Sequence, residues 1–504
     1  MELFHNLILG FSVALSWQNI WFCFLGVLLG TLIGVLPGIG PLATIAMLLP
    51  ITFNLPPVPA LIMLAGIYYG SQYGGSTTAI LVNLPGETSA VVTCMDGYQM
   101  ARQGRAGPAL AIAAVGSFFA GTVCTMLIAL FGPPLAEIAL KFGAPEYFSL
   151  MLMGLVAAAV LAGDNMVKAL AMVVLGLLLG IVGTDVNSGM ARFSFGIAEL
   201  TDGIGFIVIA VGVFAIGEIV SNLGDPEERM VFTSKVTNLM PTLPDLKASF
   251  GPILRGTGIG AFLGVLPGTG PSIASFSSYM LEKKLAKDPS RFGKGAIEGV
   301  AGPESANNAD AQCKFIPMLT LGIPASATMA LMLGALTIQG IAPGPQVMTQ
   351  KPDLFWGLVA SMWVGNAMLV VLNLPMVGMW VQLLKVPYRL LFPCIMAFSC
   401  IGVYSVNNSP FELYLTAVFG VIGFAWMKLE MPPAPMLLGF VLGPLMEENL
   451  RRALLISRGD PSVFVTRPIS LGFMIATVMI FLVMVVPAVK ARRGDISESA
   501  SPTA

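Results

Sequence analysis

Long apolar stretches separated by short polar connections dominate the chain. A helix that spans a bilayer needs about 20 apolar residues, and many of these stretches reach or approach that length. Between Glu2 and Glu87 there is no Asp, Glu, Lys or Arg. The pattern predicts an all-α polytopic membrane protein with about 10–12 transmembrane helices and several partial crossings. The apolar stretches lie near residues 17–53, 58–69, 107–131, 147–162, 166–183, 203–222, 252–281, 315–340, 354–384, 391–406, 411–427, 432–446 and 469–489.

An octapeptide occurs twice in this pattern. GVLPGIGP at 34–41 returns as GVLPGTGP at 264–271, with seven of eight positions identical. A weaker match pairs residues 76–81 with 326–331, so we expect the same two interrupted helices in each half. The repeat predicts a simple division of the chain: a first membrane repeat at 1–225, a polar connection at 226–250, a second repeat at 251–490 and a polar tail at 491–504.

Basic residues indicate how the two halves are oriented, because Lys and Arg collect in cytoplasmic loops. Between the two motifs of the first half, residues 54–59 carry no charge, whereas the equivalent connection in the second half carries several basic residues. After the second motif the bias is reversed: the first half has Arg102 and Arg105, and the second half has only Lys351. The bias is therefore opposite in the two halves, which favours inverted repeats, as in many secondary transporters. We predict an elevator-like movement of the motif-bearing segments. The basic residues after the second octapeptide are Lys283, Lys284, Lys287, Arg291, Lys294 and Lys314.

The octapeptides are expected to break their helices. Proline removes a backbone hydrogen bond, and the neighbouring glycines do not cover the freed groups. Such breaks survive in a membrane only where protein or a water-filled cavity supplies partners. Exposed N–H groups suit an anion and freed carbonyls suit a cation, with close helix packing as the alternative role of the glycines. The candidates are Pro37, Gly38, Gly40, Pro267, Gly268 and Gly270, with Na+ held through Gly38, Gly268 and Thr269.

Hydroxyl and amide side chains form a second set of candidates. The hydroxyls of the second motif follow predicted helix breakers, so they either cap a helix or bind a carboxylate or Na+. The segment 302–310 is either part of the site, with amides that donate to an anion, or a cytoplasmic loop. Lys314 either attracts a carboxylate or ends a helix at the surface. The candidate substrate-binding residues are Ser76, Thr77, Thr78, Asn83, Ser305, Asn307, Asn308, Ser326 and Thr328.

Composition excludes several other classes. A formal net charge of -1 without a basic tract argues against nucleic-acid binding. The single histidine, His5, argues against a metalloprotease, and no nucleophile–base pair is evident, so we expect no enzyme and no cofactor. No phosphate-binding loop for ATP is present. Because no acidic relay is evident in the core, Na+ is slightly favoured over H+ as the coupling ion.

Several segments closely resemble the large, TctA-type membrane subunit of the tripartite tricarboxylate transporters. They are GVLPGIGPLATIAMLLPITF (34–53), YGGSTTAILVNLPGE (73–87), DGYQMARQGRAGPAL (96–110), GVLPGTGP (264–271) and GPESANNADAQCKFIPMLTLGIPASA (302–327). The resemblance implies a multi-pass protein in the lipid bilayer of the bacterial inner membrane. It also implies a small four-helix membrane subunit and a periplasmic carboxylate-binding protein as partners.

The function implied by this resemblance is ion-gradient-driven import of a di- or tricarboxylate, a citrate-like organic acid, with Na+ or H+ as the coupling ion. The sequence does not distinguish the carboxylate, because in this family the binding protein largely makes that choice. Two other classes stay open at this point: a passive anion channel, since broken helices also build filters, and, less favoured, a membrane-embedded enzyme.

Overall fold

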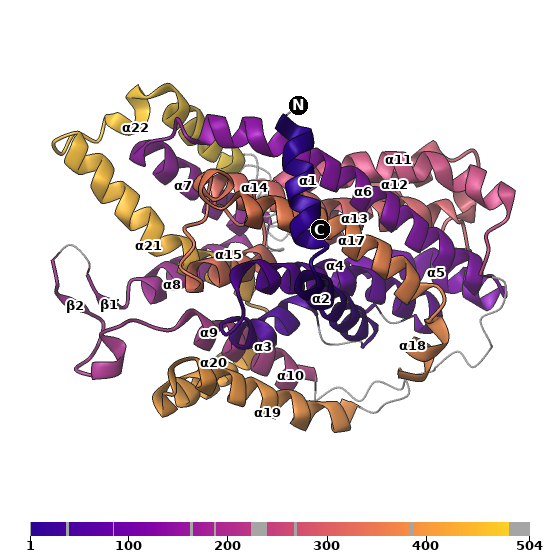
Figure 1. Cartoon of the computed structure of the whole chain (residues 1–504), viewed down its shortest axis with the longest axis horizontal. Helices are drawn as coiled ribbons and strands as arrows, with labels where there is room; N and C mark the ends of the chain where they lie inside the picture. Colours follow the sequence, from indigo (N-terminus) through magenta and orange to yellow (C-terminus); the bar gives the residue numbers. More distant parts are fainter. Residues whose placement is uncertain are drawn as a thin grey trace, which may run out of the picture. The chain divides into compact units, whose positions relative to one another are not determined.

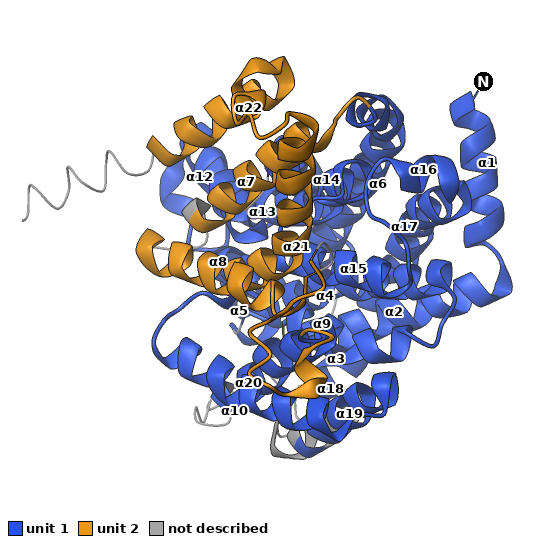
Figure 2. Ribbon diagram, turned by 90° about the vertical axis from the view of Figure 1, so that its left-hand side faces the viewer, with its two compact units in different colours: residues 1–140, 204–433 blue, residues 141–203, 434–504 orange. Residues whose placement is uncertain are grey.

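The computed structural model describes residues 2–36, 40–83, 85–161, 165–185, 188–222, 239–266, 270–383 and 388–482. These residues are overwhelmingly helical, with one short antiparallel strand pair among them (Figure 1). The chain divides into two compact units, coloured separately in Figure 2. Unit 1 comprises residues 1–140 and 204–433, and unit 2 comprises residues 141–203 and 434–504. The all-α fold is as predicted.

Unit 1 contains most of the helices, including both helices that follow an octapeptide break. Its elements are α1 (Glu2–Ala14), α2 (Trp17–Val35), α3 (Pro41–Thr52), α4 (Pro57–Val82), η1 (Thr88–Ala90), α5 (Val91–Arg102), α6 (Ala106–Ala139), α9 (Phe206–Ile209), the π-helical η3 (Ala210–Ile216), α10 (Gly217–Asn222), α11 (Leu243–Val265), α12 (Pro271–Leu285), η4 (Pro289–Arg291), α13 (Glu298–Cys313), α14 (Phe315–Leu321), α15 (Ala327–Ile338), α16 (Gln346–Gln350), α17 (Pro352–Asn373), α18 (Val377–Leu383), α19 (Tyr388–Asn407) and α20 (Pro410–Lys428).

Unit 2 is held together by close helix contacts and by ion pairs. Glu146 pairs with Arg467 at 3.0 Å, and Asp185 pairs with Arg451 at 3.1 Å. Its elements are α7 (Ala144–Leu161), α8 (Met166–Gly180), β1 (Gly183–Thr184), β2 (Ala191–Arg192), η2 (Ala198–Leu200), α21 (Pro433–Ile456), α22 (Val463–Thr466) and an apolar helix at Pro468–Leu482.

Four helices in the described part of the chain are long and apolar enough to cross a bilayer: α2, α6, α17 and α20. Shorter apolar helices, among them α1, α3, α8 and α15, accompany them. This supports a multi-pass membrane protein, whereas the figure of about 10–12 crossings stays a prediction. Other long helices are too polar to meet the same criterion because they carry the residues of the site.

Both octapeptides interrupt their helices at the same place. α2 ends at Val35 and α3 begins at Pro41, while α11 ends at Val265 and α12 begins at Pro271. Proline at the first position of a helix loses no hydrogen bond, and its fixed φ suits the start of a helix. The predicted interruptions are therefore present. The candidates Pro37, Gly38, Pro267, Gly268 and Thr269 lie outside the described residues.

The helices after the breaks also end alike. α4 ends at Asn83 with φ 58°, and α14 ends at Gly322 with φ 71°, so both end in the left-handed conformation that terminates helices. A proline follows two residues later in each case, at Pro85 and Pro324. The predicted pairing of 76–81 with 326–331 is therefore wrong: Ser76 lies inside α4, whereas Ser326 caps the start of α15.

Glycines allow α2 and α11 to touch the backbone of the polar helices. A Cβ on Gly30 of α2 would lie 2.5 Å from the Ile67 carbonyl oxygen of α4. A Cβ on Gly260 of α11 would lie 2.2 Å from the Ala306 carbonyl oxygen of α13. Small residues commonly permit such approach between membrane helices. Consequently α4 and α13 are covered so closely that residues 59–82 and 299–313 are all buried.

Asp96 ties α5 to the connection that precedes α13. Its fully buried carboxylate accepts hydrogen bonds from the backbone N–H groups of Gly293, Gly295 and Ala296 at 2.8–2.9 Å. The Tyr279 hydroxyl donates a fourth bond at 2.9 Å. Because buried carboxylates require such donors, Asp96 fixes the entry to α13 against α5.

Two glycines on α11 provide a matched test of this packing. Gly260→Ala should destabilise the protein by roughly 1–3 kcal/mol, because the new methyl group collides with backbone. Gly258→Ala should be neutral or slightly stabilising, since nothing lies within 4 Å of a Cβ there. The measurement is the thermal midpoint of detergent-purified protein, followed by fluorescence-detected size exclusion. Equal midpoints for the two variants would contradict the close α11–α13 contact.

Candidate functional site

The hydroxyls of Ser76, Thr77 and Thr78 lie inside α4 and not at a helix start, so the alternative of a capping role is wrong for Ser76 and Thr77. The Ser76 Oγ atom, whose single proton also has Glu304 within reach, lies 3.0 Å from the Gln72 carbonyl oxygen, and Thr77 donates to the Tyr73 carbonyl at 3.5 Å. Thr78 donates to the Val35 carbonyl at 3.0 Å. Since Val35 is the last residue of α2, Thr78 satisfies a carbonyl that the helix end leaves free.

Ser326 and Thr328 lie at the start of α15. Ser326 caps this helix, because its Oγ accepts a hydrogen bond from the Met329 N–H at 3.3 Å. The capping role is confirmed for this residue. Thr328 is buried in the first turn of the helix, while Asn83 is exposed at the end of α4.

The segment 302–310 belongs to the buried helix α13. The expected alternative of a cytoplasmic loop is therefore wrong for these residues. Ionisable and amide side chains inside a membrane protein are costly, so they are normally retained for function or paired with one another. α13 contacts α4, α5, α6, α11 and α12, which surround its polar side chains.

Glu304 of α13 joins two helices from the other half of the sequence. Ser76 of α4 donates to its Oε2 and Thr93 of α5 donates to its Oε1. The Glu304 side chain is 1% exposed, and it makes no ion pair with any described residue. Two neutral hydroxyls therefore hold a carboxyl group at the junction of α4, α5 and α13.

The two adjacent asparagines point in different directions. Asn307 Nδ2 donates to Glu87 Oε1 at 3.2 Å. Asn308 Nδ2 donates to Ser117 Oγ of α6 at 2.7 Å, and Ser305 donates back to the Ala301 carbonyl at 2.8 Å. Among these three predicted residues, Asn307 alone reaches the acidic side chains, whereas Asn308 holds α13 to α6.

Asp310 and Lys314 form an ion pair one helical turn apart. Both side chains are 0% exposed. The expectation that Lys314 might end a helix at the surface is therefore wrong. Breaking a buried ion pair by removing one partner typically costs about 3–5 kcal/mol, because a charge is left uncompensated. Glu87 lies in the electrostatic field of Lys314, so the three side chains form one group.

We call Glu87, Glu304, Asp310 and Lys314 the charge cluster; Glu87 is partly exposed, and the other three are buried. All four lie in the predicted motifs, but the neighbouring hydroxyls and amides were predicted as the site residues. The core does contain acidic side chains, since Glu304 and Asp310 are fully buried. The available signal was the charge itself: four ionisable residues within segments that carry few others.

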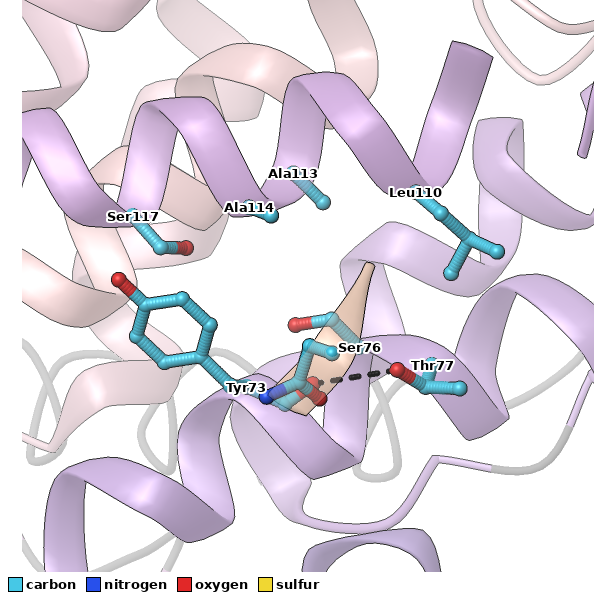
Figure 3. Close-up of a pocket in the computed structure, with 8 residues that line it drawn as sticks. Tyr73, Ser76, Thr77, Leu110, Ala113, Ala114 and Ser117 are labelled. Carbon is cyan, nitrogen blue, oxygen red and sulfur yellow. Dashed lines mark hydrogen bonds between the residues drawn. The ribbon is translucent and has the colours of Figure 1, made fainter. Parts of the chain in front are cut away.

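A small cavity lies beside this cluster (Figure 3). Its volume of about 10 Å³ suits one water molecule and not a carboxylate. Figure 3 shows side chains of α4 facing those of α6 across it. The predicted residues Ser76 and Thr77 thus border a water-sized space. The full lining is Tyr73, Ser76, Thr77, Leu110, Ala113, Ala114, Ser117 and Asn373.

The N-terminus of α3 already has an anionic partner. Gly40, the residue that precedes α3, donates its N–H to Glu218 Oε1 at 3.3 Å. Gly270, at the equivalent place before α12, has nothing within 4 Å of a Cβ position. The two broken helices therefore begin in different surroundings, and the first is occupied by a carboxylate of the chain itself.

A multi-pass helical fold with charged side chains sealed among its helices is typical of membrane transport proteins. Residues 20–438 match the tripartite tricarboxylate transporter TctA family. The chain belongs to this family, which is a family of transporters. Membership implies partner subunits, because the transporter is tripartite.

Two relatives from Agrobacterium vitis are similar to the chain. An uncharacterised 52.8 kDa protein in the TAR-I ttuC' 3' region is 58% identical over 98% of this chain and 99% of its own length. An uncharacterised protein in the TAR-II ttuC' 3' region is 56% identical over 47% of this chain and 98% of its own length. No solved structure matches the chain.

Two threonines test how Glu304 is held. Thr93→Val should cost roughly 1–3 kcal/mol, because it leaves a buried carboxyl oxygen without its donor at nearly constant side-chain volume. Thr77→Val is the control: it is equally buried, but its hydroxyl bonds only to its own helix, at 3.5 Å. Thermal midpoints of the purified variants provide the measurement. A Thr77→Val loss as large as that of Thr93→Val would remove the special role of the Glu304 contact.

Proposed function

We propose that this chain is the large membrane subunit of a secondary transporter in the bacterial inner membrane. Driven by a Na+ or H+ gradient, it imports a di- or tricarboxylate that a periplasmic binding protein delivers. A small four-helix membrane subunit completes the system. Family membership supports the class of protein, and the buried cation of Lys314, directly after α13, supports an anionic substrate.

The observation that carries this proposal is the buried Lys314. A cation sealed in the interior next to Asp310 contributes little net stability compared with apolar residues of similar size. Such a residue is more readily explained by function than by stability. A carboxylate that enters the site would replace Asp310 as the partner of Lys314, so the charge pair would be maintained during transport.

The matched helix ends support a two-repeat architecture. In each half a helix breaks at the octapeptide, and a later helix, α4 in the first half and α14 in the second, ends in a left-handed residue before a proline. We propose that the repeats are inverted, as the distribution of basic residues predicts, and that α4 and α13 move together as the transport element of an elevator. Their mutual contact through Ser76 and Glu304 supports joint movement.

Energy coupling separates the proposed carrier from a passive anion channel. Uptake by a carrier saturates with substrate and collapses when an ionophore removes the ion gradient, whereas flux through a channel follows the substrate gradient alone. Proteoliposomes that contain both membrane subunits, supplied with the binding protein and labelled citrate or another di- or tricarboxylate, allow this measurement. Unsaturable uptake without a gradient would overturn the proposal.

Lys314→Gln should abolish uptake, but it also leaves Asp310 without its partner. The double variant Asp310→Asn with Lys314→Gln removes both charges. Compared with Lys314→Gln alone, it should recover most of the lost stability, because no unpaired ion remains. We expect the double variant to keep a normal thermal midpoint and still to transport at least about tenfold more slowly, since the substrate carboxylate loses its cation.

Lys351→Gln is the control, because Lys351 is exposed at the start of α17. It should leave uptake unchanged. Wild-type uptake by the folded double variant would exclude Lys314 from substrate binding and leave it a structural role only. Thermal midpoints and initial uptake rates are measured on the same preparations.

A further inference from the structure

Four side-chain oxygen atoms on α13 are buried without a hydrogen-bond donor among the residues that the structure describes: Glu298 Oε2, Asn307 Oδ1, Asp310 Oδ1 and Gln312 Oε1. Asn307 and Asp310 are the two that belong to or contact the charge cluster and share one face of the helix. The residues are 1% and 0% exposed. Buried acceptors are normally satisfied, so each exception requires an explanation.

The orientation of the Asn307 amide is fixed by its neighbour. Its Nδ2 donates to Glu87 Oε1, and the Glu87 carboxylate offers no proton in return when ionised. Turning the amide over would place two acceptor oxygens against each other. The Asn307 Oδ1 atom therefore stays without a partner. Its missing partner must be a hydrogen-bond donor or a cation.

Asn307 and Asp310 share one face of α13, because they are three positions apart in a helix. A side chain from another element approaches this face: Glu87, from the segment after α4, accepts a hydrogen bond from the Asn307 amide at 3.2 Å. Tyr68 of α4 packs against Phe315, the residue after Lys314, with ring centroids 6.3 Å apart. A carboxylate and an amide thus meet at Asn307, and Asp310 follows on the same face of the helix.

The charges near these oxygens favour a cation. With all side chains ionised, Glu87, Glu304 and Asp310 carry three negative charges and Lys314 carries one positive charge, which leaves two negative charges uncompensated. Glu304 is held by the hydroxyls of Ser76 and Thr93, which are neutral. Burial of uncompensated charge is costly, and a bound cation would reduce it.

We propose that Asn307 Oδ1 and Asp310 Oδ1, together with Glu87, bind Na+ as the coupling ion. Hard cations prefer oxygen ligands of this kind. The role of Na+ as the coupling ion rests on the proposed function. The binding site itself rests on the unpartnered oxygens. It differs from the Na+ ligands expected from the octapeptides, Gly38, Gly268 and Thr269.

The position of this site explains how cation and substrate can assist each other. Asp310 offers Oδ1 to the cation and Oδ2 to Lys314. Na+ at Oδ1 draws electron density from the carboxylate and weakens its hold on Lys314. Lys314 then becomes available to a substrate carboxylate. By linkage, bound substrate increases the affinity for Na+ to the same degree.

The test measures Na+ binding without transport. Purified full-length protein is titrated with NaCl against choline chloride at constant ionic strength, and the thermal midpoint is followed, with binding of radioactive Na+ as the second measurement. A ligand that binds the folded state alone raises the midpoint in a saturable manner. We expect this for Na+ and not for K+.

Neighbouring asparagines supply matched variants. Asn307→Ala should weaken the apparent Na+ affinity by on the order of tenfold or more, by analogy with the loss of a group that supports a metal site. Asn308→Ala should retain the wild-type Na+ response, even if its midpoint without Na+ falls, because Asn308 faces Ser117. If Asn307→Ala is not monodisperse, the folded Asp310→Asn, Lys314→Gln variant replaces it and should show a similar loss.

Three results would overturn the inference: no Na+ response in the wild type, an equal response to K+, or the same Na+ affinity in Asn307→Ala and Asn308→Ala. In the first case water molecules satisfy the free oxygens. None of these results bears on carboxylate uptake, which is measured on the wild-type protein through its saturation and its dependence on the ion gradient. Failure of the site and failure of the transport function are thus distinguishable.

Discussion

The burial of a polar helix is the constraint on which unit 1 depends. The residues of α13 are far more polar than those of a typical membrane-spanning helix, yet residues 299–313 are all buried. Charged and amide groups on it depend on partners within the protein, since lipid offers none. For Glu304 and Asn308 these partners come from α4, α5 and α6, through Ser76, Thr93 and Ser117. The polar contacts thus determine which helices surround α13.

Close backbone packing makes these contacts possible. Hydroxyl groups are short, so they reach a carboxylate only if the helices approach closely. The glycines of α2 and α11 bring each of these helices against the backbone of its partner, and the carbonyl contacts at Gly30 and Gly260 leave no room for a methyl group. Small residues and buried charges are therefore two parts of one arrangement: the first provides the proximity and the second uses it.

Part of this arrangement was predictable from local rules. Proline and glycine act on their own backbone, so the ends of α2 and α11 and the starts of α3 and α12 follow from the octapeptides alone. The roles of Ser76 and Lys314 depend on neighbours that are distant in the sequence, which no local rule supplies. Ser76 was predicted to follow a helix breaker, but the helix continues to Val82 because α2 covers its backbone.

The charge cluster illustrates the same limit. A lysine beside a polar segment resembles a loop in sequence, and only the surrounding helices make Lys314 an interior residue. The predicted repeat boundaries at 225 and 251 come from similarity between the two halves of the sequence. The compact units come from contacts between residues, and they divide the chain differently, at 1–140 with 204–433 and at 141–203 with 434–504.

The two halves supply different chemistry to one site. α4 contributes neutral groups, namely the hydroxyls of Tyr68, Ser76 and Thr78, whereas α13 and the residue after it contribute Glu304, Asp310 and Lys314. Glu87, from the segment after α4, is the exception, because it adds a charge from the first half. Most of the charge is therefore concentrated on α13 and its end, and neutral hydrogen-bond donors on its neighbour. A neutral donor adapts to a carboxyl group in either protonation state, whereas a second charged helix would favour one state only.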